Sequence, residues 1–294
     1  MSKVSVLPMD VEKSITTCKE QIFEQEKLKE SFPNTLLRED VLELLDRFCT
    51  VVYFPLKREE NNGFHITGVP FADGSKQHFV FINTAQTMEK QVFTAAHELG
   101  HIWHVDDYVI KDLGLDDTAE LREMIINRFA AVLLIPGDIF DGSVDVHIKE
   151  YGATDKTITI KNLLKVIVVL MNQFFVPMKS IVLRLVERNF FSPDVADILL
   201  GNAGLSKEVI DQQIQSLITE FGFIKFQTPS MKKWIEGLAE NLDLAEKNHL
   251  VSQAKIDHMR EKFDLQPPAS TTTEITTEMG NILSLVTQEG TDKE

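Results

Sequence analysis

The stretch Gln91-Val92-Phe93-Thr94-Ala95-Ala96-His97-Glu98-Leu99-Gly100-His101 decides the fold, because it combines a helix pattern with a paired-histidine motif. Two histidines four positions apart on a helix differ by ~40° in direction and by about one turn in height. His97 and His101 can therefore bind one zinc ion at about 2.0–2.1 Å. Glu98 projects toward a water on the metal rather than toward the metal, which is the place of a general base. The motif predicts a zinc-dependent hydrolase.

The residues around the motif predict a helix from Met88 to His104. Thr87 is suited to the N-cap position, Glu89 places a negative charge in the first turn, and no proline interrupts the stretch. Gly100 costs about 1 kcal/mol relative to Ala inside a helix, so its presence predicts close packing beside the motif. A buried stripe is formed by Val92, Ala95, Ala96, Leu99 and Ile102.

A catalytic zinc site needs a third protein ligand and an open position. A second helix is expected to start near Asp117, taken as its N-cap, and to run to Leu134 before Pro136-Gly137. Two carboxylates on it compete for the metal. Glu120 has a capping role at the helix start, whereas Glu123 lies a turn inside. We select Glu123 as the third ligand, with Glu120 as the alternative.

Three β-rich runs precede the zinc helix, at 51–54, 64–69 and 78–82, with a turn signal at 73–75. Beyond Gly152 the pattern is helical. It predicts helices at 158–175 and 178–188, with Pro177 at the first helical position of the second. Two more are expected at 231–246 and 251–263, where Trp234, Ile235, Leu238 and Leu242 are assigned to a core. The fold class is therefore α+β, with a small mixed β-sheet packed on the zinc-binding helices and an all-helical C-terminal region.

Three parts of the chain together match a known family pattern. They are Phe79-Val80-Phe81-Ile82-Asn83, the helix 91–101, and Glu123 with Asn127-Arg128-Phe129-Ala130-Ala131-Val132-Leu133-Leu134-Ile135-Pro136. This combination resembles the ImmA/IrrE-type zinc metallopeptidases, an HExxH, gluzincin-like family, over about residues 48–190. Many members carry another acidic residue and an Ala just before the Asn. Ile125 and Ile126 stand there in this chain, so Glu123 is the only carboxylate at the matching place.

The resemblance implies a zinc-dependent endopeptidase that cleaves a regulatory protein, namely a helix-turn-helix repressor of a phage, a mobile element or a stress response. His97, His101 and Glu123 would hold Zn²⁺, and Glu98 would be the catalytic base. The alternative from another class is a binding module that sequesters a regulator without cutting it, with a structural zinc. A hydrolase of small amides is a third possibility.

A second oxyanion donor is usual in such sites. Four residues are candidates that the sequence does not separate: His104, Tyr108, His147 and Tyr151. His104 is expected to lie ~60° around the helix from His101, in a supporting or exposed position rather than as a ligand.

The domain organisation follows from these assignments. Residues 1–35 form a peripheral N-terminal segment with a helix at 13–32, and residues 36–155 form the metallopeptidase core. Residues 156–263 form a helical region, which begins with a segment similar to the helix-turn-helix-like part of the family. Residues 264–294 are a polar, disordered tail.

Composition excludes several classes of protein. The net charge is -15, and Lys179, Arg184 and Arg188 are too few for a basic stripe, so no direct nucleic acid binding is expected. The N-terminal residues lack the apolar stretch of a signal peptide, and the apolar run 166–171 is too short to span a bilayer. Cys18 and Cys49 lack CxxC spacing. Reduced thiols in a cytoplasmic protein without membrane contact are expected.

Overall fold

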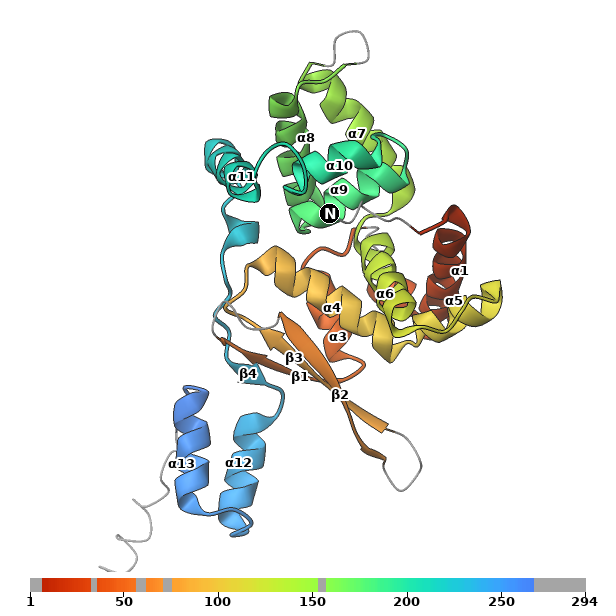
Figure 1. The fold of residues 1–294 in the computed structure, drawn as a ribbon. Helices are drawn as coiled ribbons and strands as arrows, with labels where there is room; N and C mark the ends of the chain where they lie inside the picture. Colours follow the sequence, from red (N-terminus) through yellow and green to blue (C-terminus); the bar gives the residue numbers. More distant parts are fainter. Residues whose placement is uncertain (1–6, 33–35, 57–61, 71–75, 153–156, 267–294) are drawn as a thin grey trace, which may run out of the picture. The chain divides into compact units, whose positions relative to one another are not determined.

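The computed structural model describes residues 7–32, 36–56, 62–70, 76–152 and 157–266, with the backbone alone at 65–70 and 76–77. The chain divides into two compact units, residues 1–233 and 234–294 (Figure 1). The predicted turn at 73–75 and nearly all of the predicted tail lie outside the described residues.

The first unit contains a mixed sheet and most of the helices, which confirms the α+β class with a helical C-terminal region. Its elements are α1 (Met9–Gln25), α2 (Leu28–Ser31), α3 (Asp40–Asp46), β1 (Thr50–Phe54), β2 (Gly63–Pro70), β3 (Lys76–Asn83), α4 (Met88–Ile102), α5 (Val105–Leu113), α6 (Ala119–Leu134), α7 (Gly137–Glu150), α8 (Ile160–Phe174), α9 (Met178–Glu187), α10 (Pro193–Leu199), α11 (Lys207–Phe221) and the 3-10 turn η1 (Lys225–Gln227). The second unit contains β4 (Trp234–Ile235), α12 (Leu238–Lys247) and α13 (Gln253–Lys262).

In the first unit, β3 lies between β1, which is parallel to it, and β2, which is antiparallel. The three predicted strands are confirmed. Side chains alternate along β3, where Val80 and Ile82 are fully buried and Phe81 between them is not. The buried face packs against α4, which lies across the sheet (Figure 1). The sheet therefore fixes the position of the helix that carries the paired histidines.

Helix α6 packs directly on α4. The contact is close at Gly100, where an added Cβ would lie 2.8 Å from Cδ1 of Phe129 and 3.2 Å from Cδ1 of Ile126. Any side chain at this position would push the two helices apart. The close packing predicted from Gly100 is confirmed, and it explains the glycine inside the helix despite its cost.

The expected start of the second metal-site helix is wrong by one residue. The N-cap of α6 is Thr118, whose hydroxyl accepts a hydrogen bond from the backbone N–H of Leu121 at 3.2 Å. Asp117 instead accepts hydrogen bonds from Arg122 at 2.6 and 2.8 Å. A nearby guanidinium is the stronger partner for a carboxylate, so the less polar threonine caps the helix.

The expected end of the zinc helix is also wrong. Helix α4 stops at Ile102, and His104 has a φ of 51°, in the left-handed region, as the N-cap residue of α5. His104 therefore does not continue the face of His101. Pro177 is the N-cap of α9 rather than its first helical residue.

The C-terminal region differs from the sequence pattern at one helix. No helix starts at Met231, because α12 begins at Leu238 after Gly237, which has a φ of 66°. Trp234 is 37% exposed, and α12 contains no buried residue, so the core assigned to Trp234 and its neighbours is wrong. The helix expected at 251–263 is confirmed as α13.

A buried network of charges joins α1 to α6 and α9. The carboxylate of Glu12 accepts hydrogen bonds from Arg128 at 2.5 Å and from Arg184 at 2.8 Å, and Glu187 contacts both arginines. The side chain of Arg184 is fully buried. Burial alone would raise the pKa of Glu12, but Arg184 and Arg128 outweigh it and lower the pKa to about 2.

No single helix among the described residues is long and apolar enough to cross a membrane. Helices α8 and α9 meet that test only when joined, and they are bent by 106° at the break.

Candidate metal centre

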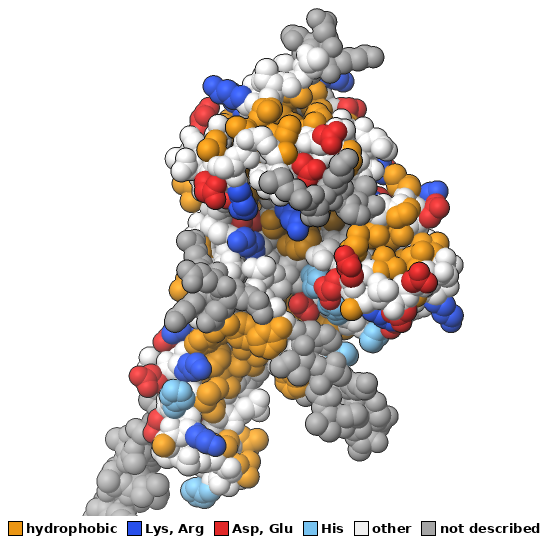
Figure 2. Space-filling view, viewed as in Figure 1, with side chains coloured by type: hydrophobic (Ala, Val, Ile, Leu, Met, Phe, Trp, Pro, Cys, Tyr) orange, Lys and Arg blue, Asp and Glu red, His pale blue; other side chains and the backbone are white. Residues whose placement is uncertain are grey.

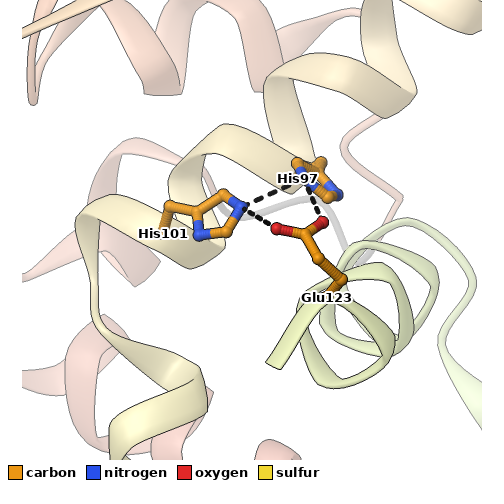
Figure 3. A group of neighbouring side chains, drawn as sticks. All are labelled: His97, His101 and Glu123. Atoms are coloured by element: carbon orange, nitrogen blue, oxygen red, sulfur yellow. Dashed lines mark hydrogen bonds and ion pairs between the residues drawn. The ribbon is translucent and has the colours of Figure 1, made fainter. Parts of the chain in front are cut away.

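Three side chains from two helices converge at the contact between α4 and α6. His97 and His101 lie one turn apart on α4, and Glu123 reaches toward them from α6 (Figure 3). The Nε2 atoms of the two histidines are 3.1 Å apart. The carboxylate oxygens of Glu123 lie 3.6 Å from His97 Nε2 and 3.5 Å from His101 Nε2. The two ring nitrogens and the carboxylate thus surround one point.

These separations suit a tetrahedral metal ion. Ligand atoms at about 2.0–2.1 Å from zinc in a tetrahedral arrangement are about 3.3 Å from one another. The three measured separations lie on either side of that value. Two imidazoles and one carboxylate also form the donor set of many catalytic zinc sites, which leave a fourth position open. Glu120, the alternative ligand, does not belong to this group.

The protonation of His97 favours metal binding. Burial lowers the pKa of His97, and the neighbouring His101 lowers it further. The charge of Glu123 and a hydrogen bond with Asn127 act in the opposite direction. A neutral imidazole keeps the lone pair that a metal needs.

Asn127 contacts both His97 and Glu123 and so connects the two helices of the cluster. Its Nδ2 donates a hydrogen bond to the backbone carbonyl of Glu123 at 2.7 Å, and its side chain also interacts with His97. Metal-binding histidines are generally oriented by a polar partner of this kind. The sequence offered a signal for Asn127, because it lies one turn after Glu123 on the same face of α6.

Glu98 follows His97 on α4, and both residues line one cleft. The side chain of Glu98 is buried, and no hydrogen-bond partner is present among the described residues. Burial raises the pKa of Glu98 to about 7, with a further contribution from the charge of Glu123. A carboxylate with a pKa close to neutral can both accept and return a proton, as a general base must.

A cleft of about 270 Å³ lies beside the cluster, which it reaches at His97. The walls come from the start of β2, from α4 and from α6, and the lining residues are Asn62, Gly63, Phe93, Thr94, His97, Glu98 and Asn127. Figure 2 shows histidine and acidic side chains together at the surface where α4 and α6 meet. The site is therefore accessible from solvent.

None of the four expected oxyanion donors lines this cleft among the described residues. His104 is an exposed residue 3.5 Å from Asp107, and His147 lies 3.1 Å from Glu150. Tyr151 packs near Phe221, and Tyr108 packs against the hydrophobic core. The polar side chains that do line the cleft besides His97 are Asn62, Thr94, Glu98 and Asn127. Nothing in the sequence pattern singled out Asn62.

Comparison with known proteins supports a peptidase domain in this part of the chain. Residues 47–185 match the Peptidase_M78 family, described as the IrrE N-terminal-like domain. The match covers slightly less than half of the chain and includes every residue of the metal cluster. It confirms the resemblance to the ImmA/IrrE type over these residues. No match was found among curated proteins.

Proposed function

We propose that this chain is a zinc-dependent endopeptidase in which His97, His101 and Glu123 hold the metal and Glu98 is the general base. The convergence of the three ligand atoms beside a buried carboxylate, in an open cleft, carries the proposal. The peptidase family match over the same residues supports it. A purely structural metal site would not need Glu98 at the cleft wall.

A bound zinc ion would polarise the scissile carbonyl and lower the pKa of a water molecule to about 7. Glu98 then has two tasks. It accepts a proton from the attacking water, and it passes that proton to the amine that leaves. The raised pKa of Glu98 suits both steps. The carboxylate is basic enough to accept the proton, and the carboxylic acid is acidic enough to donate it.

The cleft also suggests how a peptide would be held. Strand β3 is paired on both sides and cannot accept another strand. Strand β2 has a neighbour on one side only among the described residues, and it begins at the cleft wall with Gly63. An extended peptide can add to such an edge through main-chain hydrogen bonds. We assign β2 as the strand that binds the substrate.

The substrate class rests on the family resemblance. We propose a regulatory protein, and among these a helix-turn-helix repressor, as the target. The free thiols of Cys18 and Cys49 fit a reducing compartment such as the cytoplasm.

The test is a mass-spectrometric survey of new protein N-termini in a lysate of the native host. The zinc-loaded wild type is compared with zinc-loaded Glu98→Gln. New termini found only with the wild type would support the proposal and would identify the substrate and the bond. Identical sets of termini in both samples would contradict it, and equal inactivation of a repressor by both proteins would favour sequestration.

A further inference from the structure

Phe64 is a large aromatic residue on the edge strand β2 that remains 43% exposed. It follows Gly63, which lines the cleft, on the edge strand β2. Its ring stacks on that of Phe81 in the central strand, with a centroid distance of 5.0 Å and an interplanar angle of 7°. The ring is thus held in place from one side and open to solvent on the other.

Gly63 and Phe64 face opposite sides of the sheet. A Cβ at Gly63 would lie 2.7 Å from Cγ2 of Thr94, so this position points toward α4 and the cleft. Phe64 pairs with Phe81 across the strands, and Phe81 points away from the face on which Val80 and Ile82 are buried. Successive residues of a strand alternate between faces, which places the two rings on the face opposite α4.

A peptide bound along the edge of β2 would have the same alternation. If one of its side chains enters the cleft beside Phe93 and Thr94, the side chain of the next residue must point to the other face of the sheet. On that face it meets the exposed part of Phe64. Cross-strand neighbours on one face are close enough for direct packing.

We propose that Phe64 is a specificity-determining residue, which packs against an apolar substrate side chain next to the one that enters the cleft. This inference rests on the proposed endopeptidase function and narrows its substrates. The expected substrates are extended segments in which one side chain enters the cleft and the neighbouring residue is apolar. The side chain of that neighbour lies on the same face of the sheet as Phe64. Covering the exposed part of a phenylalanine changes kcat/KM by on the order of tenfold.

The experiment uses the full chain, loaded with zinc, and a library of peptides made from a digested proteome. Cleavage sites are sequenced for the wild type, Phe64→Ala and Phe64→Leu. Val146→Ala is the matched control, because Val146 is 60% exposed on α7 and does not line the cleft. Zinc content and circular dichroism are recorded for every variant, so that a folding defect is separated from a change in selectivity.

The wild type, the control and Phe64→Leu are expected to prefer an apolar residue at one position close to the cleaved bond. Phe64→Ala should lose this preference, with kcat/KM about tenfold lower for peptides that carry the apolar residue and unchanged for those with Ala there. An unchanged profile in a folded Phe64→Ala overturns the inference but leaves the peptidase function intact. If Phe64→Ala does not fold, a Phe64→Ser variant replaces it under the same criteria. Cleavage of the same library by zinc-loaded Glu98→Gln at the wild-type rate overturns both this inference and the proposed endopeptidase function.

Discussion

Helix α6 carries two polar clusters that differ in how their charges are balanced. At Arg128 it joins a closed cluster, in which Glu12 and Glu187 face two buried arginines. At Glu123 it joins an open cluster of two histidines and the nearby Glu98. Among the described residues no lysine or arginine pairs with Glu98 or Glu123. The closed cluster pairs two carboxylates with two guanidinium groups and so balances its own charge, whereas the open one has an excess of acidic groups that a cation can neutralise.

The difference distinguishes a structural polar cluster from a candidate functional one on physical grounds alone, without reference to a family. The closed cluster joins α1, α6 and α9, and its residues are not among the described residues that line the cleft. The open cluster has three ligand atoms around one point, a carboxylate with a raised pKa and solvent at its side. Each of the following substitutions should therefore affect one cluster and leave the other unchanged.

The largest effect is expected from Glu98→Gln, which removes the proton acceptor from the open cluster but keeps its volume. The rate of peptide hydrolysis should fall by roughly 10²–10⁴. Zinc content and thermal stability should stay at the wild-type level, because Glu98 is not a ligand in our assignment. Steady-state cleavage of a peptide found in the N-terminal survey measures the rate, and atomic absorption measures the zinc. Loss of zinc together with activity would contradict the separate role of Glu98.

Glu12→Ala should break the closed cluster. It leaves Arg128 and Arg184 buried with Glu187 as their remaining shared carboxylate among the described residues. Breaking a buried ion pair by removing one partner costs about 3–5 kcal/mol of unfolding free energy. Urea denaturation measures the change. Glu20→Ala on the exposed side of the same helix is the control and should change the stability by less than about 0.5 kcal/mol. A stable Glu12→Ala protein would show that α1 is not anchored by this network.

Acid should weaken the closed cluster in the same way. The pKa of Glu12 is about 2 in the folded protein, against an ordinary value of about 4.5 for a glutamate in the unfolded chain. The lowered pKa contributes about 3 kcal/mol above pH 4.5, and this contribution is lost as the pH falls from 4.5 to 2. The difference in unfolding free energy between wild type and Glu12→Gln should therefore shrink over this range. A difference that stays constant between pH 5 and pH 2.5 would contradict the low pKa.

A smaller effect is expected from Asn127→Ala, which removes the side chain that contacts His97 and the backbone of Glu123. Zinc affinity should fall by about 10–100-fold, which is the usual effect of removing a residue that orients a metal ligand. Competition with a zinc-binding dye measures the affinity. Asn127→Asp retains a hydrogen-bond acceptor for the His97 ring and should lose less zinc affinity. Wild-type affinity in Asn127→Ala would show that His97 needs no such support.

Local sequence patterns predicted the parts of the site that depend on one or two helices. The spacing of His97 and His101 fixes their common direction, and the position of Glu123 one turn inside α6 aims it at them. Strand alternation likewise predicted β1, β2 and β3. These features depend on residues that are close in the chain, so the period of the helix or strand is enough to predict them.

The patterns failed where partners distant in sequence or a single backbone angle decide the outcome. The left-handed φ of His104 ends α4 early, and neither glycine nor proline, the strongest signals of a helix end, stands there. Glu12 meets Arg184 across 172 positions, which no local pattern relates. Asn62 reaches the cleft only because β2 pairs with β3. Each of these depends on tertiary packing rather than on a helix or strand period.

The most direct test of the metal centre is the zinc content per chain of the wild type, Glu123→Ala and Glu120→Ala, purified side by side and dialysed against the same zinc buffer. Our assignment predicts one zinc per chain in the wild type and in Glu120→Ala, and a large loss in Glu123→Ala. Full zinc occupancy in Glu123→Ala would contradict the assignment of the third ligand, and the absence of zinc from the wild type would contradict the metallopeptidase itself.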